Sequence, residues 1–189
     1  MELVFDFFED HLKAAAAVKG RRPLALGVLC FILGALSFFI AMGVSGRLAP
    51  VPCNWVNFCL FLIWELVSSL ALVAVLHLIA DFEGRQGSGA ELFVLFGMAS
   101  LSWALAVPLA LVFMAFLPSA QWPLTAVFLL VGFYNLSLKV RSLQDTYQFS
   151  QGRAWITLVL PYMATVTATG VALALAMASL VIQVMKSFD

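Results

Sequence analysis

Five long apolar runs constrain this chain of 189 residues more than any other feature of its sequence. The hydrocarbon core of a bilayer is about 30 Å thick, and an α-helix needs about 20 apolar residues to cross it. The predicted spans cover residues 24–44, 56–80, 91–117, 123–138 and 155–185. The sequence therefore predicts an all-α, polytopic integral membrane protein with a bundle of five transmembrane helices.

Composition supports a membrane environment. Apolar residues make up 63% of the chain and charged residues 11%, against about 45–50% and about 25% in soluble domains. The ten basic and ten acidic residues cancel, so we expect no nucleic-acid partner. The three cysteines include no CxxC pair, so we expect no metal and no cofactor. A disulfide between Cys53 and Cys59 is an alternative to two free thiols.

The fourth run is the shortest, and one alternative count merges or demotes it. It follows a tight connection, residues 118–123, that contains two prolines and Trp122. These residues are typical of a hairpin at the membrane surface, which favours five spans.

Basic residues predict the orientation in the membrane. With five spans, eight of the ten fall on the same side as the N-terminus: Lys13, Lys19, Arg21, Arg22, Arg85, Lys139, Arg141 and Arg153. Because short cytoplasmic loops collect Lys and Arg, we expect the N-terminus in the cytoplasm and the C-terminus outside.

Ahead of the membrane domain (residues 21–189), residues 1–20 are predicted to form a cytoplasmic amphipathic helix. Its apolar side groups Leu3, Val4, Phe7, Phe8, Leu12 and Ala15. Such a helix lies along the membrane interface. Packing beneath the bundle is favoured over lipid sensing, because its acidic face gains nothing from anionic lipid.

Small residues predict where the helices pack, because they allow two helix backbones to approach closely. Two series repeat at helical spacing: Gly27, Gly34 and Ala41 in the first span, and Ala164, Ala168, Ala172 and Ala176 in the fifth. We expect both spans to be central in the bundle.

Glu65 lies about ten residues inside the second span, where an ionisable group costs several kcal/mol unless it is neutralised or paired. The predicted spans place no Lys or Arg at matching depth. The functional interpretation is a contact with a proton, ion or substrate. The structural interpretation is a hydrogen bond to another helix through Ser68, Ser69 or Asn135.

His77 lies twelve residues after Glu65, about 120° away around the helix, so the two do not share a face. A proton relay along this helix is not expected. His77 lies near the cytoplasmic end, where a packing or interfacial role is favoured over a functional one.

Two predicted cytoplasmic loops carry the remaining candidate side chains: Asp81, Glu83 and Arg85 in the first, and Arg141, Asp145 and Tyr147 in the second. Two carboxylates could hold a divalent metal, but the glycine spacing fits neither a P-loop nor a dinucleotide fingerprint. A turn between two spans is the simpler interpretation of the first loop. The second contains no catalytic triad.

Residues 77–100 resemble the junction between the second and third spans of the Yip family, the Ypt/Rab-interacting five-span membrane proteins. There, a Gly-Gly-Lys-Gly-like turn precedes a Gly-Tyr-Ala-Ser-like step. Gly84-Arg85-Gln86-Gly87 and Gly97-Met98-Ala99-Ser100 stand at those places. Arg85 is one position from the usual Lys, and Met98 replaces Tyr.

Residues 134–154 are similar to a second family pattern, with a Trp-Ser-Leu step, a Gly-Leu-Arg-Glu step and a His-Gly-Leu-Ser step. Asp145 takes the place of the Glu, and Tyr147 that of the His. Ser142 and Gln148 replace glycines.

The resemblance implies a compact five-helix bundle with a short C-terminus outside the cytoplasm. For eukaryotic relatives it implies membrane traffic and small-GTPase partners, but those proteins carry a longer N-terminal segment. The chain looks more like the short bacterial members, which places it in the inner membrane and suggests no established activity.

Three hypotheses of function follow. The first is a non-enzymatic, Yip-type protein that binds lipid or a protein partner at its cytoplasmic face, alone or as a homo-oligomer. The second is a small transporter, channel or lipid-moving protein that uses Glu65. The third is a membrane enzyme that acts on a phosphorylated lipid at Asp81 and Glu83.

Overall fold

The computed structural model describes residues 2–21, 23–47, 52–116 and 121–186, and every regular element within these ranges is helical. The elements are α1 (Glu2–Glu9), α2 (His11–Arg21), α3 (Leu24–Val44), α4 (Trp55–Phe82), α5 (Gly89–Ser100), the 3₁₀-helix η1 (Leu101–Leu105), α6 (Ala106–Phe116), α7 (Gln121–Tyr147) and α8 (Gln151–Lys186). Five spans are long and apolar enough to cross a bilayer, with α5, η1 and α6 forming the third. The predicted fold class is confirmed.

The fourth span is longer than predicted. α7 continues through Tyr147, nine residues beyond the expected end at 138, so most of the predicted loop of residues 139–153 is helix. The charges at Lys139 and Arg141 ended the apolar run, but charge does not end a helix. The chain leaves helical geometry at Gln148, whose φ is 56°. Residues 118–120 of the predicted hairpin lie outside the described residues.

The N-terminal segment forms two helices rather than one. The break is at Asp10, whose carboxylate accepts a hydrogen bond from the backbone N–H of Lys13 at 3.2 Å. Asp10 thus caps the start of α2 and competes with a continuous helix. The break lets Phe7 of α1 and Val18 of α2 both pack against the bundle.

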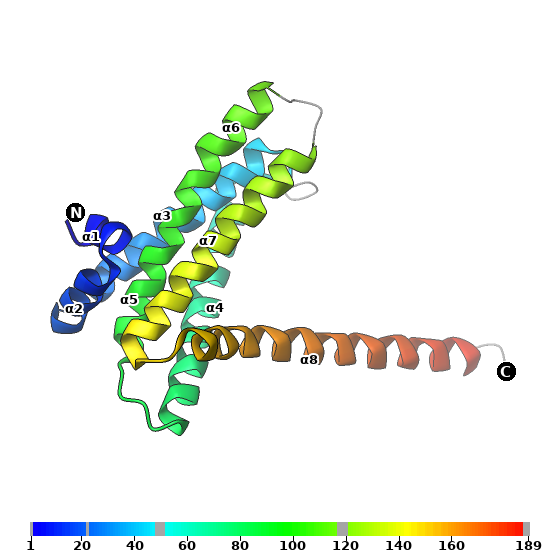
Figure 1. Cartoon of the computed structure of the whole chain (residues 1–189). Coiled ribbons are helices and arrows are strands. Elements are labelled where there is room, and N and C mark those ends of the chain that lie inside the picture. The colour runs from blue at the N-terminus through cyan, green and yellow to red at the C-terminus, as the bar shows by residue number, and fades with distance from the viewer. Residues whose placement is uncertain (1, 22, 48–51, 117–120, 187–189) are drawn as a thin grey trace.

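α3 lies at the centre of the bundle, in contact with α4, α5, η1 and α6 (Figure 1). Gly27 packs on Val94 of α5, and Gly34 packs against the backbone of Ser100. A Cβ atom at Gly34 would lie 2.5 Å from the carbonyl oxygen of Ser100, a distance that no real contact allows. The glycine series therefore marks the closest helix contact, and Ala41 is buried further along the same helix.

The third span changes from α-helix to 3₁₀-helix near its midpoint and back again. Pro108 follows this change by one turn, and proline removes a backbone donor and crowds the carbonyl four residues before it. Asn135 of α7 is buried beside the irregular turn. Its amide nitrogen donates to the carbonyl of Ala99 at 2.8 Å and to the hydroxyl of Ser102 at 3.0 Å.

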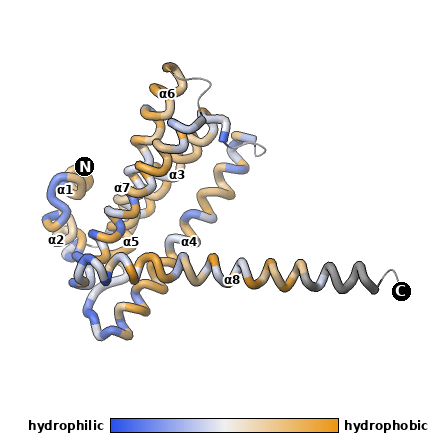
Figure 2. Tube along the Cα trace, turned by 45° about the vertical axis from the view of Figure 1, so that its right-hand side comes forward, coloured by the Kyte–Doolittle hydropathy of each residue, from blue (hydrophilic) through white to orange (hydrophobic). Residues whose placement is uncertain are grey.

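α8 departs most from expectation. Its first turns contact α4 and α7, and the rest of its 36 residues projects away from the other spans (Figure 1). The projecting part is mostly apolar (Figure 2). Its alanine series is exposed throughout: Ala164, Ala168, Ala172 and Ala176. The prediction that the fifth span is central is therefore wrong for the described chain.

The hydroxyl groups of α8 explain how it can project into an apolar medium. Thr165 donates to the carbonyl of Pro161 at 2.8 Å, Thr167 to that of Met163 at 2.7 Å, and Thr169 to that of Thr165 at 2.8 Å. Each hydroxyl is satisfied within the helix, as hydrocarbon requires.

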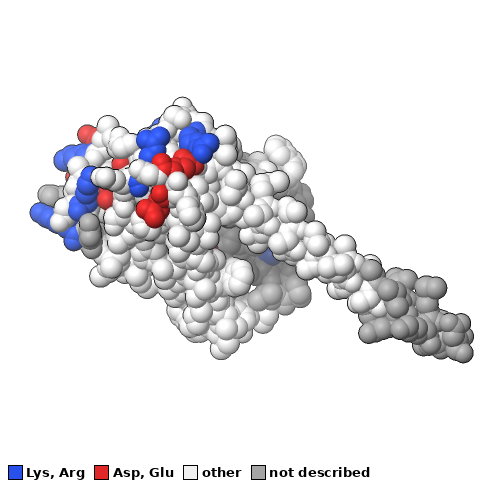
Figure 3. All heavy atoms as spheres, turned by 90° about the horizontal axis from the view of Figure 1, so that it is seen from below, with Lys and Arg blue, Asp and Glu red and all other residues white. Residues whose placement is uncertain are grey.

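Charged side chains gather over one end of the bundle, seen from below in Figure 3, whereas the described side chains along the projecting part of α8 include none. Several pair there: Lys13 with Asp6, at 2.8 Å between Nζ and Oδ1, and Arg153 with Glu83. We call this the charged end. It contains α1, α2 and the loop between α4 and α5.

Candidate functional site

Glu65 lines a recess of about 220 Å³ on the surface of the bundle. The wall is built by α3, α4, α5 and η1 and comprises Gly34, Ala35, Phe38, Phe61, Trp64, Glu65, Ser100 and Trp103. Glu65 lies ten residues, about 15 Å, along α4 and is half-buried. Trp64 is 70% exposed, so the recess opens onto the outer surface of the spans.

Aromatic rings hold the recess in shape. The ring of Phe38 stacks on Phe61 with 5.6 Å between centroids and meets Trp103 edge-on at 4.6 Å. Trp103 belongs to η1, which packs against α3. The irregular turn that Asn135 stabilises therefore positions part of the wall.

Lys139 of α7 and Tyr162 of α8 lie within electrostatic range of the Glu65 carboxylate. Sequence reasoning did not foresee Lys139 near Glu65, because the predicted fourth span ended at 138, which placed Lys139 in a loop. The ammonium of Lys139 lies 5.6 Å from the ring centroid of Phe96, in a cation–π contact.

Two of the three expected hydrogen-bond partners of Glu65, Asn135 and Ser68, are engaged elsewhere. The amide nitrogen of Asn135 donates to the carbonyl of Ala99 in the third span. The hydroxyl of Ser68 donates to the backbone carbonyl of Glu65 at 3.1 Å. Neither interaction involves the Glu65 carboxylate.

His77 belongs to a second cluster, near the charged end. Its Nδ1 lies 2.8 Å from the hydroxyl oxygen of Tyr147, which is only 1% exposed. Gly87 packs so closely on the Tyr147 ring that a Cβ atom there would overlap it. The cluster joins α4, α7 and the loop between α4 and α5.

The carboxylates of the first loop do not converge. Glu83 pairs with Arg153, whose Nε lies 3.1 Å from Oε1, whereas Asp81 is exposed. The guanidinium of Arg85 lies 5.5 Å from the centroid of the Phe149 ring. Among the described residues, no group of three or more His, Cys, Asp or Glu side chains is placed to hold a metal ion.

Sequence reasoning missed His11 as a contact residue. Its Nδ1 lies 2.5 Å from Oδ2 of Asp145, and its Nε2 lies 3.4 Å from the hydroxyl of Ser142. This contact fastens α2 to α7. Arg141, on the same stretch of α7, is exposed. In the sequence, His11 directly follows Asp10, a residue type that often caps a helix. Amphipathic periodicity alone does not indicate a break there.

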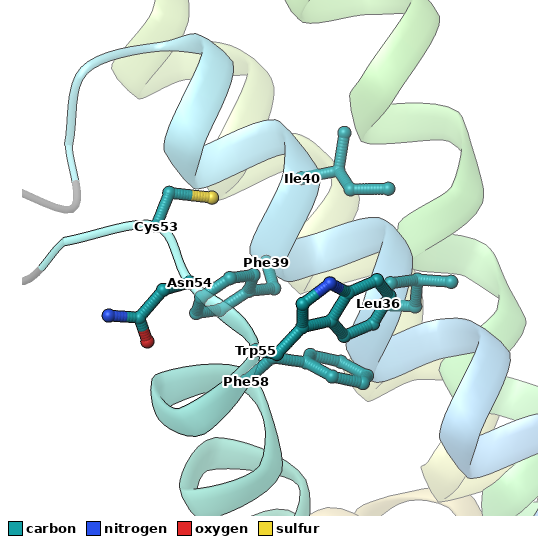
Figure 4. Close-up of a pocket in the computed structure, with 7 residues that line it drawn as sticks. All are labelled: Leu36, Phe39, Ile40, Cys53, Asn54, Trp55 and Phe58. Carbon is teal, nitrogen blue, oxygen red and sulfur yellow. The ribbon is translucent and has the colours of Figure 1, made fainter.

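A larger recess of about 290 Å³ lies near the N-terminal end of α4 and is nearly all apolar (Figure 4). Phe39, Trp55 and Phe58 contribute aromatic rings to its wall, and no Asp, Glu, Lys, Arg or His lines it. Cys53 lies at its edge, and Cys53 and Cys59 are both free thiols. Its chemistry suits acyl chains rather than a specific polar ligand.

Comparison with protein-family models, with curated proteins and with solved structures finds no match to this chain.

Proposed function

We propose that this integral membrane protein binds a small amphiphilic molecule from the lipid phase at Glu65, as a transporter or lipid-handling protein rather than an enzyme. The observation that carries the proposal is the recess beside an intramembrane carboxylate. An ionisable side chain at such depth is costly, and its usual justification is an ion, proton or substrate contact. A packed, sealed Glu65 would have removed this support.

The shape of the site favours entry from the membrane. Trp64 at the rim is largely exposed, and the surface around it is the apolar outside of α3 and α4. The proline-linked 3₁₀ turn beside the recess is a local departure from α-helix, which often marks a hinge at a functional site. The two features together suit a site that admits a ligand and changes shape around it.

The proposal can be tested by tryptophan quenching in nanodiscs. A variant that keeps Trp103 and carries Phe in place of the other four tryptophans reports on the recess; a matched variant keeps only Trp122, which is 74% exposed and lies outside it. A brominated amphiphile should quench Trp103 saturably, and excess unbrominated amphiphile should reverse the effect. Quenching that rises linearly in both variants would mean that lipid contact alone explains it.

A second candidate is the partner-binding scaffold that the Yip resemblance implies, with the charged end in the cytoplasm of a bacterial cell and the spans in its inner membrane. Phe82, next to the charged loop, is 90% exposed. Leu78, one helical turn earlier in α4, is 55% exposed as well. Contiguous exposed apolar side chains rimmed by polar residues mark an interaction site. Membrane lipid or a protein could occupy it, in the monomer or in a homo-oligomer.

Photo-crosslinking distinguishes these occupants. A photoreactive amino acid in place of Phe82 should give a discrete protein adduct in native membranes if this end docks a partner. The same group in place of Leu129, an exposed apolar residue within α7, should give lipid adducts only. Lipid adducts at both positions would leave the scaffold hypothesis without support.

A further inference from the structure

The wall of the Glu65 recess combines one carboxylate with four aromatic side chains: Phe38, Phe61, Trp64 and Trp103. The face of an aromatic ring carries partial negative charge and attracts cations. The other three wall residues are Gly34, Ala35 and Ser100, and Glu65 alone among the eight is ionisable. The wall therefore attracts positive charge.

We propose that the recess binds the alkylammonium group of an amphiphilic organic cation, an assignment that rests on the proposed function of the site. Groups of aromatic rings are the recurrent protein environment for quaternary ammonium ligands. A carboxylate in a medium of low dielectric constant strengthens the attraction, because less solvent screens it. An anionic headgroup would meet repulsion from both components of the wall.

The size of the recess defines which part of the ligand it holds. Pockets that enclose drug-sized molecules have volumes of about 300–1,000 Å³, and this recess has about 220 Å³. It therefore accommodates a headgroup, while the alkyl chain stays outside, against the apolar surface of the spans. An amphiphilic cation has this division into a compact charged end and an apolar tail.

Lys139 is the protein's own cation near Glu65, but it does not line the recess. Its ammonium lies over the ring of Phe96, which is not a wall residue either. Ser100 donates its hydroxyl proton to the carbonyl of Phe96 at 3.0 Å, so this proton is not directed at a ligand. The interior of the recess thus remains available to an external cation.

The test is equilibrium binding of radiolabelled dodecyltrimethylammonium to the full chain in neutral maltoside micelles. Its neutral isostere, with a tert-butyl group in place of trimethylammonium, is the competitor that isolates charge. Saturable binding that Glu65→Gln weakens by about tenfold or more, and that Trp103→Leu also weakens, is the expected result. Asp81→Asn and Trp122→Leu, outside the recess, are the matched controls and should change nothing.

Two contrary outcomes overturn different claims. If the isostere competes as well as the cation and Glu65→Gln has no effect, while Trp103→Leu still weakens binding, the recess binds alkyl chains without regard to charge and the cation assignment fails. If no saturable binding responds to Trp103→Leu, the proposed function fails with it. Normal thermal unfolding of each variant shows that a loss of binding is not a loss of fold.

The ammonium group could belong to a phospholipid headgroup or to a single-chain amine, and a second arm separates these sources. Binding is repeated in nanodiscs of phosphatidylglycerol with and without phosphatidylethanolamine. Displacement of the probe by phosphatidylethanolamine identifies a lipid headgroup as the ligand. Undiminished specific binding identifies free amphiphilic amines. Either result supports the alkylammonium assignment, and loss of the Glu65 dependence in both membranes contradicts it.

Discussion

His11 and Asp145 show how much a single contact can fix in this protein. They are the ring and the carboxylate that join α2 to α7, and both side chains are mostly buried. Asp145→Asn should weaken the contact by about 1–2 kcal/mol, because it removes a charge from a partly buried hydrogen bond. Amide hydrogen exchange should then quicken in residues 2–21 and stay unchanged in α3. Unchanged exchange in the N-terminal helices would show that apolar packing alone holds them.

Gly87 makes the second prediction at the scale of the residue. A methyl group at this position would overlap the Tyr147 ring, so Gly87→Ala should cost about 1–3 kcal/mol of stability. Combined with Tyr147→Ala, the same change should cost less, because the overlap with the ring is gone and only the backbone oxygen of Thr146, 2.9 Å from the new Cβ, remains close. Thermal unfolding of both variants measures the difference. Gly20→Ala, with no atom within 4 Å of the new Cβ, is the control.

Sequence reasoning found Glu65 because a carboxylate within an apolar run is visible without a structure. It missed the wall around Glu65, because Phe38, Phe61 and Trp103 look like ordinary apolar residues until three helices bring them together. It missed Lys139 for a different reason. The predicted fourth span was ended at the first charged residue of the run, whereas helix α7 continues past it to Tyr147.

At the scale of the element, α3 and α8 carry similar series of small residues, but only the series of α3 packs against other helices. Gly34 of α3 touches the Ser100 backbone, whereas Ala172 of α8 is exposed. Spacing predicts that a helix can pack closely, but the surface that it meets is set by the other helices and by the connection before it. For α8, the short connection after Tyr147 directs the helix away from the bundle.

Gly34→Ala and Ala172→Leu test this contrast. The first should lower stability by about 1–3 kcal/mol, because the added methyl group meets backbone that cannot move aside. The second should change stability by less than about 0.5 kcal/mol, as expected for an exposed site. Thermal unfolding in detergent compares the two. A comparable loss for Ala172→Leu would show that this face of α8 packs against another helix.

At the scale of the whole molecule, the gathering of charge at one end predicts that the loop between α4 and α5 lies in the cytoplasm and that the residues just before α4 lie outside. A variant that keeps Cys53 as its sole cysteine should react with a membrane-impermeant maleimide on intact cells. A cysteine-free chain carrying Arg85→Cys should react only after permeabilisation. Labelling of both from the outside, or of Arg85→Cys alone, would contradict the predicted orientation.

The measurement that tests the account most directly is a structure of the full chain in lipid nanodiscs, with dodecyltrimethylammonium present. We predict elongated density that ends beside Glu65, between Trp64 and Trp103, with its tail along the apolar surface of the spans. A recess filled by the protein's own side chains, with the Glu65 carboxylate bonded directly to Lys139, would contradict it. That result would make Glu65 a structural residue and remove the ligand site from the molecule.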